Sequence, residues 1–135
     1  MAEVLSERMA LVEKMLDCYA RRDADGLQAL LHKNAKHTTP GSDFGTDIVG
    51  GAAIADYFRT KVWTSFDRKT TFDRVHWWED AARSVVILEW KSHVRPKTGK
   101  EYSNDGAFVV EIRDGLVYWV REYFDTERAH KNVNP

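Results

Sequence analysis

The 135-residue chain is poor in cysteine and proline, with one cysteine and three prolines. A single cysteine, Cys18, cannot form a disulfide within the chain, and it cannot supply a cluster of zinc-binding thiolates. The five histidines include no His-x-x-x-His or His-x-His pair, so we expect no metal site. The glycine motifs that cradle phosphates and dinucleotides are also absent from the sequence. Any chemistry is therefore expected to need no cofactor.

The sequence also lacks long apolar runs and an excess of charge of one sign. No segment approaches the roughly 20 apolar residues needed to cross a bilayer. Residues 1–10 lack the basic and apolar stretches of a signal peptide. The formal net charge of −1 gives no electrostatic reason to expect nucleic acid or a membrane as partner. With the lone cysteine, these features predict a cytoplasmic protein.

Aromatic residues, in contrast, are abundant: five Trp, five Tyr and six Phe. They cluster in segments that predict strands, which indicates a wide apolar interior, a subunit interface, or both. The chain is long enough for one hydrophobic core but not for two, so we expect a single domain over residues 1–135.

Helical patterns dominate the first half of the chain and strand patterns the second. Apolar spacing predicts three helices and a short strand, over residues 4–21, about 23–32, 52–66 and 35–40. Four long strands are predicted over residues 70–78, 83–94, 100–113 and 116–124. The polar residues after 125 predict a tail that frays or packs loosely. This order predicts an α+β fold in which helices pack on a curved antiparallel sheet around a conical cavity.

The last predicted strand contains an acid in an apolar stripe. In V-Y-W-V-R-E-Y-F-D, alternation places Glu122 between Val120 and Phe124 on one face. An unpaired carboxylate is costly there, but surroundings that raise its pKa would make it a usable general acid or base. Glu122 is therefore our first catalytic candidate. The alternative is a structural carboxylate paired with Arg74 or Arg121.

Alternation in the two preceding strands suggests which residues accompany Glu122. The even-numbered positions are the more apolar, so they should face the helices and the cavity. This places Trp90, Tyr102 and Asn104 where they could bind a substrate, although core packing is the alternative for Trp90. His37 lies on the short strand and could share a proton with Glu122. The alternative for His37 is a solvent-exposed strand position.

Three further residues are substrate-binding candidates. Thr39 follows His37 on the cavity side of the short strand, and Phe124 shares the face of Glu122. His76 precedes two tryptophans in a strand of uncertain register, and we place it in the pocket as well.

The opposite face of the last strand is also rich in large side chains. Alternation places Val117, Trp119 and Tyr123 on this outer face and Tyr118 on the cavity side. Large apolar groups on a face that a monomer would expose indicate an interface. We therefore expect a homodimer through the outer face of the sheet.

Three motifs, spread over nearly the whole chain, are shared with a known superfamily. They are Y-A-R-R-D-A-D-G-L-Q-A-L-L, G-G-A-A-I-A-D-Y-F and R-D-G-L-V-Y-W-V-R-E-Y-F-D. In these motifs the chain resembles the nuclear transport factor 2-like superfamily, in particular its SnoaL-like and limonene-epoxide-hydrolase-like branch. The resemblance implies a cone-shaped fold, with a curved antiparallel sheet wrapped on three helices around a central pocket. The superfamily mixes enzymes with binding and transport modules, so the fold alone does not define a function.

The resemblance also implies roles for single residues. In the epoxide hydrolases the acid of the last motif is a catalytic aspartate that faces the pocket, and Glu122 occupies this position. The water-holding Tyr-x-Asn of their first strand corresponds to His37 and Thr39. Their Arg-x-Asp pair falls, in two alternative registers, on Trp90 and Ser92 or on Glu89 and Lys91. Neither register repeats the pair, which argues against ordinary epoxide hydrolysis.

These observations predict a cofactor-independent acid–base enzyme: an isomerase or cyclase, dehydratase, lyase or epoxide hydrolase. Glu122 would move the proton and His37 would assist, while the other candidates would orient a small apolar, aromatic or polycyclic molecule. The rival interpretation is a dimeric module that binds a hydrophobic ligand or a protein without converting it. A structural dimerisation domain with a filled core is the third.

Overall fold

A computed structural model of the chain describes residues 4–40, 47–66, 70–97 and 100–133. Its helices are α1 (Glu7–Arg21), α2 (Ala24–Leu30), α3 (Gly51–Tyr57) and α4 (Thr126–Val133). Its strands are β1 (Leu31–Thr38), β2 (Ile48–Val49), β3 (Thr71–Asp80), β4 (Val85–Val94), β5 (Tyr102–Arg113) and β6 (Leu116–Phe124). The α+β class predicted from the sequence is confirmed.

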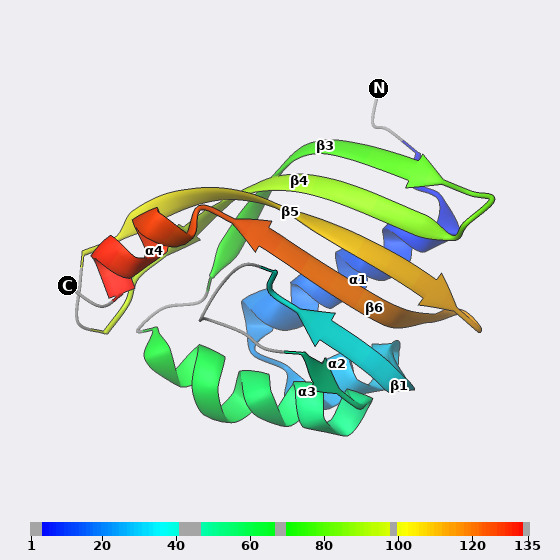
Figure 1. The fold of residues 1–135 in the computed structure, drawn as a ribbon, viewed down its shortest axis with the longest axis horizontal. Coiled ribbons are helices and arrows are strands. Elements are labelled where there is room, and N and C mark those ends of the chain that lie inside the picture. Colours follow the sequence, from blue (N-terminus) through cyan, green and yellow to red (C-terminus); the bar gives the residue numbers. More distant parts are fainter. Residues whose placement is uncertain (1–3, 41–46, 67–69, 98–99, 134–135) are drawn as a thin grey trace.

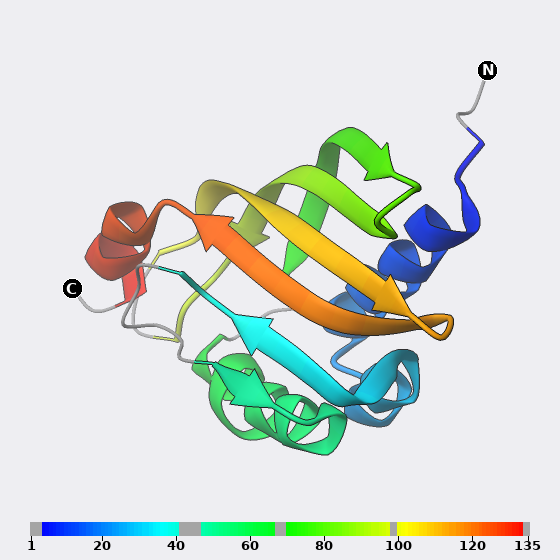
Figure 2. The ribbon, with the colours of Figure 1, turned by 45° about the vertical axis from the view of Figure 1, so that its right-hand side comes forward.

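The strands form one curved sheet in the order β2-β1-β6-β5-β4-β3. Neighbouring strands are antiparallel except β1 and β6, which run parallel and join the first half of the chain to its end. The sheet curves over α1, and α3 lies beside β1 and β2 (Figure 1). Figure 2 shows α4 beyond the end of β6, away from the other helices.

Helix α1 supplies the apolar layer under the sheet. It begins at Ser6, whose hydroxyl accepts a hydrogen bond from the backbone N–H of Met9. It ends at Arg22, which adopts the left-handed conformation with φ of 55°. The residues of its inner face are buried: Val12, Met15, Leu16, Cys18 and Tyr19. Burial of this apolar stripe, rather than helix propensity alone, stabilises the helix.

The third predicted helix is not a continuous α-helix. It passes at Phe58 into a π-helical turn, Phe58–Val62, and then into a 3-10 turn, Trp63–Ser65. A π-turn is wider than an α-turn and changes which side chains share a face. As a result, Phe58 and Trp63 both bury their rings on the same side, with ring centroids 5.6 Å apart.

Strict alternation fails in the first half of β6. The β5–β6 register shifts between Glu111 and Ile112, so that the extra residue on β6 is Tyr118. Val117 is therefore buried, and Tyr118 lies under the guanidinium of Arg113, 3.9 Å from it. The prediction of Val117 outside and Tyr118 inside was wrong, although the alternation is as expected from Val120 onward.

In β4 and β5 the predicted alternation is confirmed. The buried positions of these strands are Val86, Leu88, Trp90, Ser92, Val94, Asn104, Phe108, Val110 and Ile112. All are even-numbered, as the polarity of the two strands predicted. The sequence left two registers open for β4, one with Trp90 and one with Glu89 facing the helices. In the structure Trp90 is buried on that side and Glu89 is exposed.

The segment after residue 125 is a helix, α4, and the prediction of a fraying tail was wrong. Asp125 caps it, because its carboxylate accepts a hydrogen bond from the backbone N–H of Arg128 at 2.9 Å. Only Ala129 is buried among the residues of α4. Its only apolar residues are Ala129 and Val133, which lie one helical turn apart and both line the cavity.

The outer face of the sheet exposes large apolar side chains. Val75 is 60% exposed, Trp78 46% and Tyr123 44%. Trp119 is less available, because its indole N–H donates to the Thr38 hydroxyl at 3.0 Å. A second copy of the chain covering this face stays a prediction.

Candidate active site

A cavity of about 240 Å³ lies between α1, the turns after α3, α4 and the strands β1, β4, β5 and β6. Aromatic rings form a large part of its wall, among them those of Phe58, Trp63, Phe72, Trp90 and Phe124. At the roughly 30 Å³ that a water molecule occupies in the liquid, the cavity would hold about eight waters. This volume suits a compound of one or two rings.

His37 and Glu122 meet in the wall of this cavity. His37 is on β1 and pairs with Val120 of the parallel strand β6, two residues before Glu122. The Nε2 atom of His37 lies 4.0 Å from a carboxylate oxygen of Glu122. The His37 ring also stands edge-on to Phe58, with centroids 5.4 Å apart. The side chains are 6% and 22% exposed, so Glu122 is the more open of the two to the cavity.

Burial shifts the pKa values of the two groups in opposite directions. It raises the pKa of Glu122 from 4.5 to about 7, because the charged carboxylate loses water. It lowers the pKa of His37 from 6.5 to about 4 for the same reason. Although a separation of 4.0 Å would allow an ion pair, the proton of this dyad therefore belongs to the carboxyl near neutral pH. The imidazole beside it is neutral.

Two tyrosines share the electrostatic field of Glu122. Burial is the main cause that raises the pKa of Tyr19 and of Tyr57, and the negative charge of Glu122 raises both further. Both residues line the cavity. Their hydroxyls stay protonated over the whole range in which Glu122 titrates, so they can donate hydrogen bonds in the site.

Most of the substrate-binding candidates line the cavity with the dyad, but one does not. The residues brought together are Thr39, Trp90, Tyr102, Asn104 and Phe124. His76 is exposed and its ring lies tilted against that of Trp78 instead, with ring centroids 4.2 Å apart. A bulge in β3 between Arg74 and His76 breaks the alternation at this point. His76 therefore does not lie in the pocket, and that prediction was wrong.

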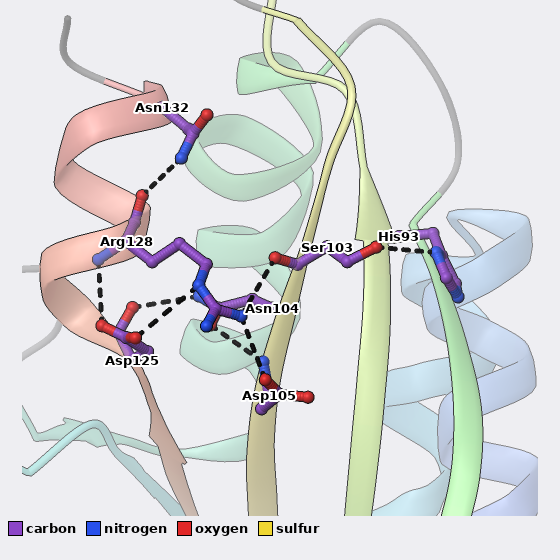
Figure 3. Close-up of polar contacts among 7 residues, drawn as sticks. All are labelled: His93, Ser103, Asn104, Asp105, Asp125, Arg128 and Asn132. Carbon is purple, nitrogen blue, oxygen red and sulfur yellow. Dashed lines mark hydrogen bonds and ion pairs between the residues drawn. The ribbon is translucent and has the colours of Figure 1, made fainter.

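Asn104 uses its amide to hold α4. Its Nδ2 donates to the backbone carbonyl of Asp125 at 3.0 Å, and its Oδ1 accepts from the backbone N–H of Asp105 at 2.9 Å (Figure 3). Arg128 of α4 reaches back to Asp105 at 3.0 Å. These contacts place Ala129 in the cavity wall. The structure thus supports a positioning role for Asn104 at least as well as a substrate contact.

Sequence reasoning missed the helical contribution to the site. Tyr19 and Tyr57 were not among the predicted site residues, and the turn after α3 was predicted as regular helix. A hydroxyl on a core-facing stripe needs a polar partner, and that requirement was the available signal. Lys61 and Val62 of the π-turn and Ser65 of the 3-10 turn also line the cavity. No local pattern in the sequence predicts those turns.

Two features are absent from the described residues: a cluster of metal-ligating side chains and a helix that could span a membrane. No group of three or more His, Cys, Asp or Glu side chains gathers there as a metal site would require. In the same part of the chain, no helix is both long and apolar enough to cross a membrane.

A curved sheet around a small cavity, with α1 and α3 packed against it, is the nuclear transport factor 2-like fold. The model of the SnoaL-like domain family matches residues 12–128. The chain belongs to the SnoaL-like family.

Solved structures share this fold at low sequence identity. A candidate polyketide cyclase from Xanthomonas campestris superposes with a TM-score of 0.80 at 20% identity, over 95% of this chain and 97% of its own. TerC, crystallised with polyporic acid, superposes with a TM-score of 0.83 at 18% identity, over 96% of this chain and 100% of its own. An epoxide hydrolase of the limonene-epoxide-hydrolase type from Mycobacterium tuberculosis superposes with a TM-score of 0.73 at 21% identity, over 93% of this chain and 87% of its own. No curated protein matches the sequence.

Proposed function

We propose that this protein is a cofactor-independent acid–base enzyme that converts a small apolar or aromatic molecule in the cavity beside Glu122. One observation carries the proposal. A carboxyl with a pKa of about 7 opens onto an apolar cavity, next to a neutral imidazole whose Nε2 has no hydrogen-bond partner among the described residues. A group that is half-protonated near neutral pH can both take and return a proton.

Each member of the dyad has a distinct task. Glu122 abstracts a proton from the substrate, or from a water, and returns it at another atom or to a leaving oxygen. Neutral His37 holds a substrate oxygen or the water in reach through Nε2. Tyr19 and Tyr57 donate hydrogen bonds to negative charge that develops on an oxygen nearby. This division suits an isomerisation, cyclisation, dehydration or hydrolysis.

Cavity size and fold relatives narrow the substrate class. A volume of about 240 Å³ lies just below the range of about 300–1,000 Å³ that is usual for ligand sites. The aromatic wall favours flat rings over flexible chains. The structural neighbours include a candidate polyketide cyclase and a protein crystallised with polyporic acid, which supports a ring compound.

The test is the variant Glu122→Gln, which keeps the size of the side chain and removes its titration. We expect a folded protein whose turnover on a panel of small ring compounds, followed by product mass, falls by about two to four orders of magnitude. The matched control is Glu89→Gln, an exposed carboxylate on the outer face of β4, and it should leave turnover unchanged.

Two results would contradict the proposal. Near-full turnover by Glu122→Gln would show that another group moves the proton. Binding of ring compounds by the wild type, without product after long incubation, would instead support a carrier. The predominantly apolar wall would suit a carrier. A carrier, however, does not need a carboxyl with a raised pKa in that wall.

A further inference from the structure

Three polar side chains on the outer face of the sheet form a chain of hydrogen bonds away from the proposed site. Nε2 of His93 lies 2.7 Å from a carboxylate oxygen of Asp73, and Nδ1 lies 3.1 Å from the hydroxyl oxygen of Ser103. A serine, an imidazole and a carboxylate linked in this order are the nucleophile, base and orienting acid of many acyl-transfer enzymes. Such a set is recognised by its geometry and not by the order of its residues in the sequence.

Strand pairing brings the three residues together from β3, β4 and β5. His93 is directly opposite Ser103, and Asp73 pairs with Lys91, two residues before His93 on the same face. The buried positions of β4 and β5 are even-numbered, so His93 and Ser103 project from the face opposite the cavity. The side chain of Asp73 is 65% exposed and that of His93 39%, so a molecule in solution can reach them.

Asp73 sets the tautomer that a base at His93 needs. An ionised carboxylate can only accept, so its contact at 2.7 Å places the imidazole proton on Nε2. Nδ1 of the neutral ring then carries a lone pair and accepts the hydrogen bond of the Ser103 hydroxyl. In serine proteases the two ring nitrogens have exchanged roles. Either nitrogen can take a proton, so the same chemistry is open to this arrangement.

A cation lies on the other side of Ser103. Nη1 of Arg128 donates to the backbone carbonyl oxygen of Ser103 at 3.4 Å, and Arg128 also pairs with Asp105 at 3.0 Å. Figure 3 shows His93 on one side of the serine and Arg128, from α4, on the other. When a serine attacks an ester, negative charge develops on the carbonyl oxygen, and a guanidinium beside the nucleophile stabilises it. Water screens this charge at an exposed site, which favours esters with good leaving groups.

We propose that Ser103, His93 and Asp73 form a second catalytic site, which hydrolyses small carboxylic esters with good leaving groups. Oγ of Ser103 bonds to the ester carbonyl carbon while its proton passes to Nδ1 of His93. The bond from this carbon to the leaving oxygen then breaks, and His93 gives the proton to that oxygen. Water attacks the acyl-serine and loses its proton to His93, which returns it to Oγ as the carboxylic acid leaves. None of the three residues lines the cavity, so the reaction does not use Glu122.

An alkyl fluorophosphonate and p-nitrophenyl acetate test the proposal. The fluorophosphonate should form a bond from phosphorus to Oγ of Ser103 with loss of fluoride and the hydroxyl proton, and peptide mass spectrometry locates the adduct. Release of p-nitrophenol, corrected for the buffer rate, should fall by about a hundredfold in Ser103→Ala, the low end of the range for general-base catalysis. Asp73→Asn should slow labelling of Ser103 by at least about tenfold, because an amide no longer fixes the proton on Nε2.

A second exposed histidine provides the matched control. His76 lies against Trp78 and has no hydrogen-bond or ion-pair partner in the part of the chain that the structure describes. His93→Gln should lose both labelling and ester hydrolysis, whereas His76→Gln should keep both. Ser103→Ala should also keep any conversion of ring compounds, so this proposal and the one for Glu122 fail separately.

Several results would overturn the proposal. One is wild-type protein that carries no adduct on Ser103. Another is ester hydrolysis by Ser103→Ala at the wild-type rate. Labelling of His93→Gln or Asp73→Asn as fast as the wild type would show that the hydrogen bonds do not activate the serine. Urea unfolding shows whether each variant is folded, and the labelling site of the wild type decides for any variant that is not.

Discussion

The opposite pKa shifts of Glu122 and His37 predict how the stability of the protein depends on pH. Between pH 4.5 and 7, native Glu122 holds a proton that the unfolded chain has lost. Its contribution to stability is therefore fully present below pH 4.5 and is lost as the pH rises through 7. Native His37 stays neutral between pH 4 and 6.5, where the unfolded imidazole is charged. Its contribution is present above pH 6.5 and is lost as the pH falls through 4.

The two contributions change with pH by similar amounts and in opposite directions, so their pH dependences nearly cancel in the wild type. Moving a pKa from 4.5 to about 7, or from 6.5 to about 4, corresponds to about 3 kcal/mol at most. From pH 4.5 to 6.5, native and unfolded states each hold one proton at these two sites. It is on Glu122 in the native state and on His37 in the unfolded one. The wild-type dyad therefore adds little pH dependence in this range, although both pKa values are far from normal.

Single substitutions should reveal how each group makes the free energy of unfolding depend on pH. Relative to the wild type, Glu122→Gln leaves only His37, so the free energy of unfolding should rise by up to about 3 kcal/mol from pH 4 to 6.5. His37→Phe leaves only Glu122, so the free energy of unfolding should fall by a similar amount from pH 4.5 to 7. Urea unfolding followed by tryptophan fluorescence, at pH values from 4 to 8, measures both.

The sign of the effect makes this prediction refutable. If both variants followed the wild-type curve, the carboxyl and the imidazole would titrate normally, and Glu122 would lose its case as an acid–base group. If both variants changed in the same direction, one of the two remaining groups would have a pKa shifted against the effect of burial, and the opposite shifts argued for the dyad would be wrong. The double variant should return close to the wild-type pH dependence.

Two further predictions concern the frame of the cavity. Gly106→Ala should lower the free energy of unfolding by about 1–3 kcal/mol, because the added methyl group displaces the Trp90 indole; urea unfolding beside Ala107→Gly is the measurement. Asn104→Ala should lower it by about 1–3 kcal/mol through loss of buried hydrogen bonds. Arg128→Ala, which breaks a largely exposed ion pair, should cost less than about 1 kcal/mol in the same assay.

The predictable part of the fold is the part set by repeating patterns. Alternation predicted the buried face of β4 and β5 correctly. A shift of one residue would move every buried side chain of these strands to the solvent, so their apolar pattern specifies the register strongly. The same rule failed at Tyr118 and near His76, where one extra residue in a strand resets the alternation. No recognisable sequence motif marks these bulges, because their positions follow from packing between strands and not from local composition.

The candidate site was predictable from the residues whose polarity conflicts with their position. Glu122 stands out as a charge in an apolar stripe, and His37 as an imidazole on a neighbouring strand. Tyr19 and Tyr57 do not conflict with helix faces, so their place beside Glu122 emerges only once α1 and the turn after α3 are packed. The helix α4 was missed because its apolar face is only two residues, Ala129 and Val133, while hydrogen bonds of Asp125 and Asn104 hold its first turn.

The parallel pairing of β1 with β6 has a consequence for how the site comes into being. His37 belongs to the first strand and Glu122 to the last, and only this pairing brings them to 4.0 Å. The remaining strand pairs join neighbours in the sequence and can form while the chain between β1 and β6 is still unsettled. The dyad is therefore assembled by the contact of longest sequence separation in the sheet. The cavity-lining tryptophan of β4 needs only strand pairs between sequence neighbours, whereas the proton-transfer centre needs the first and last strands to meet.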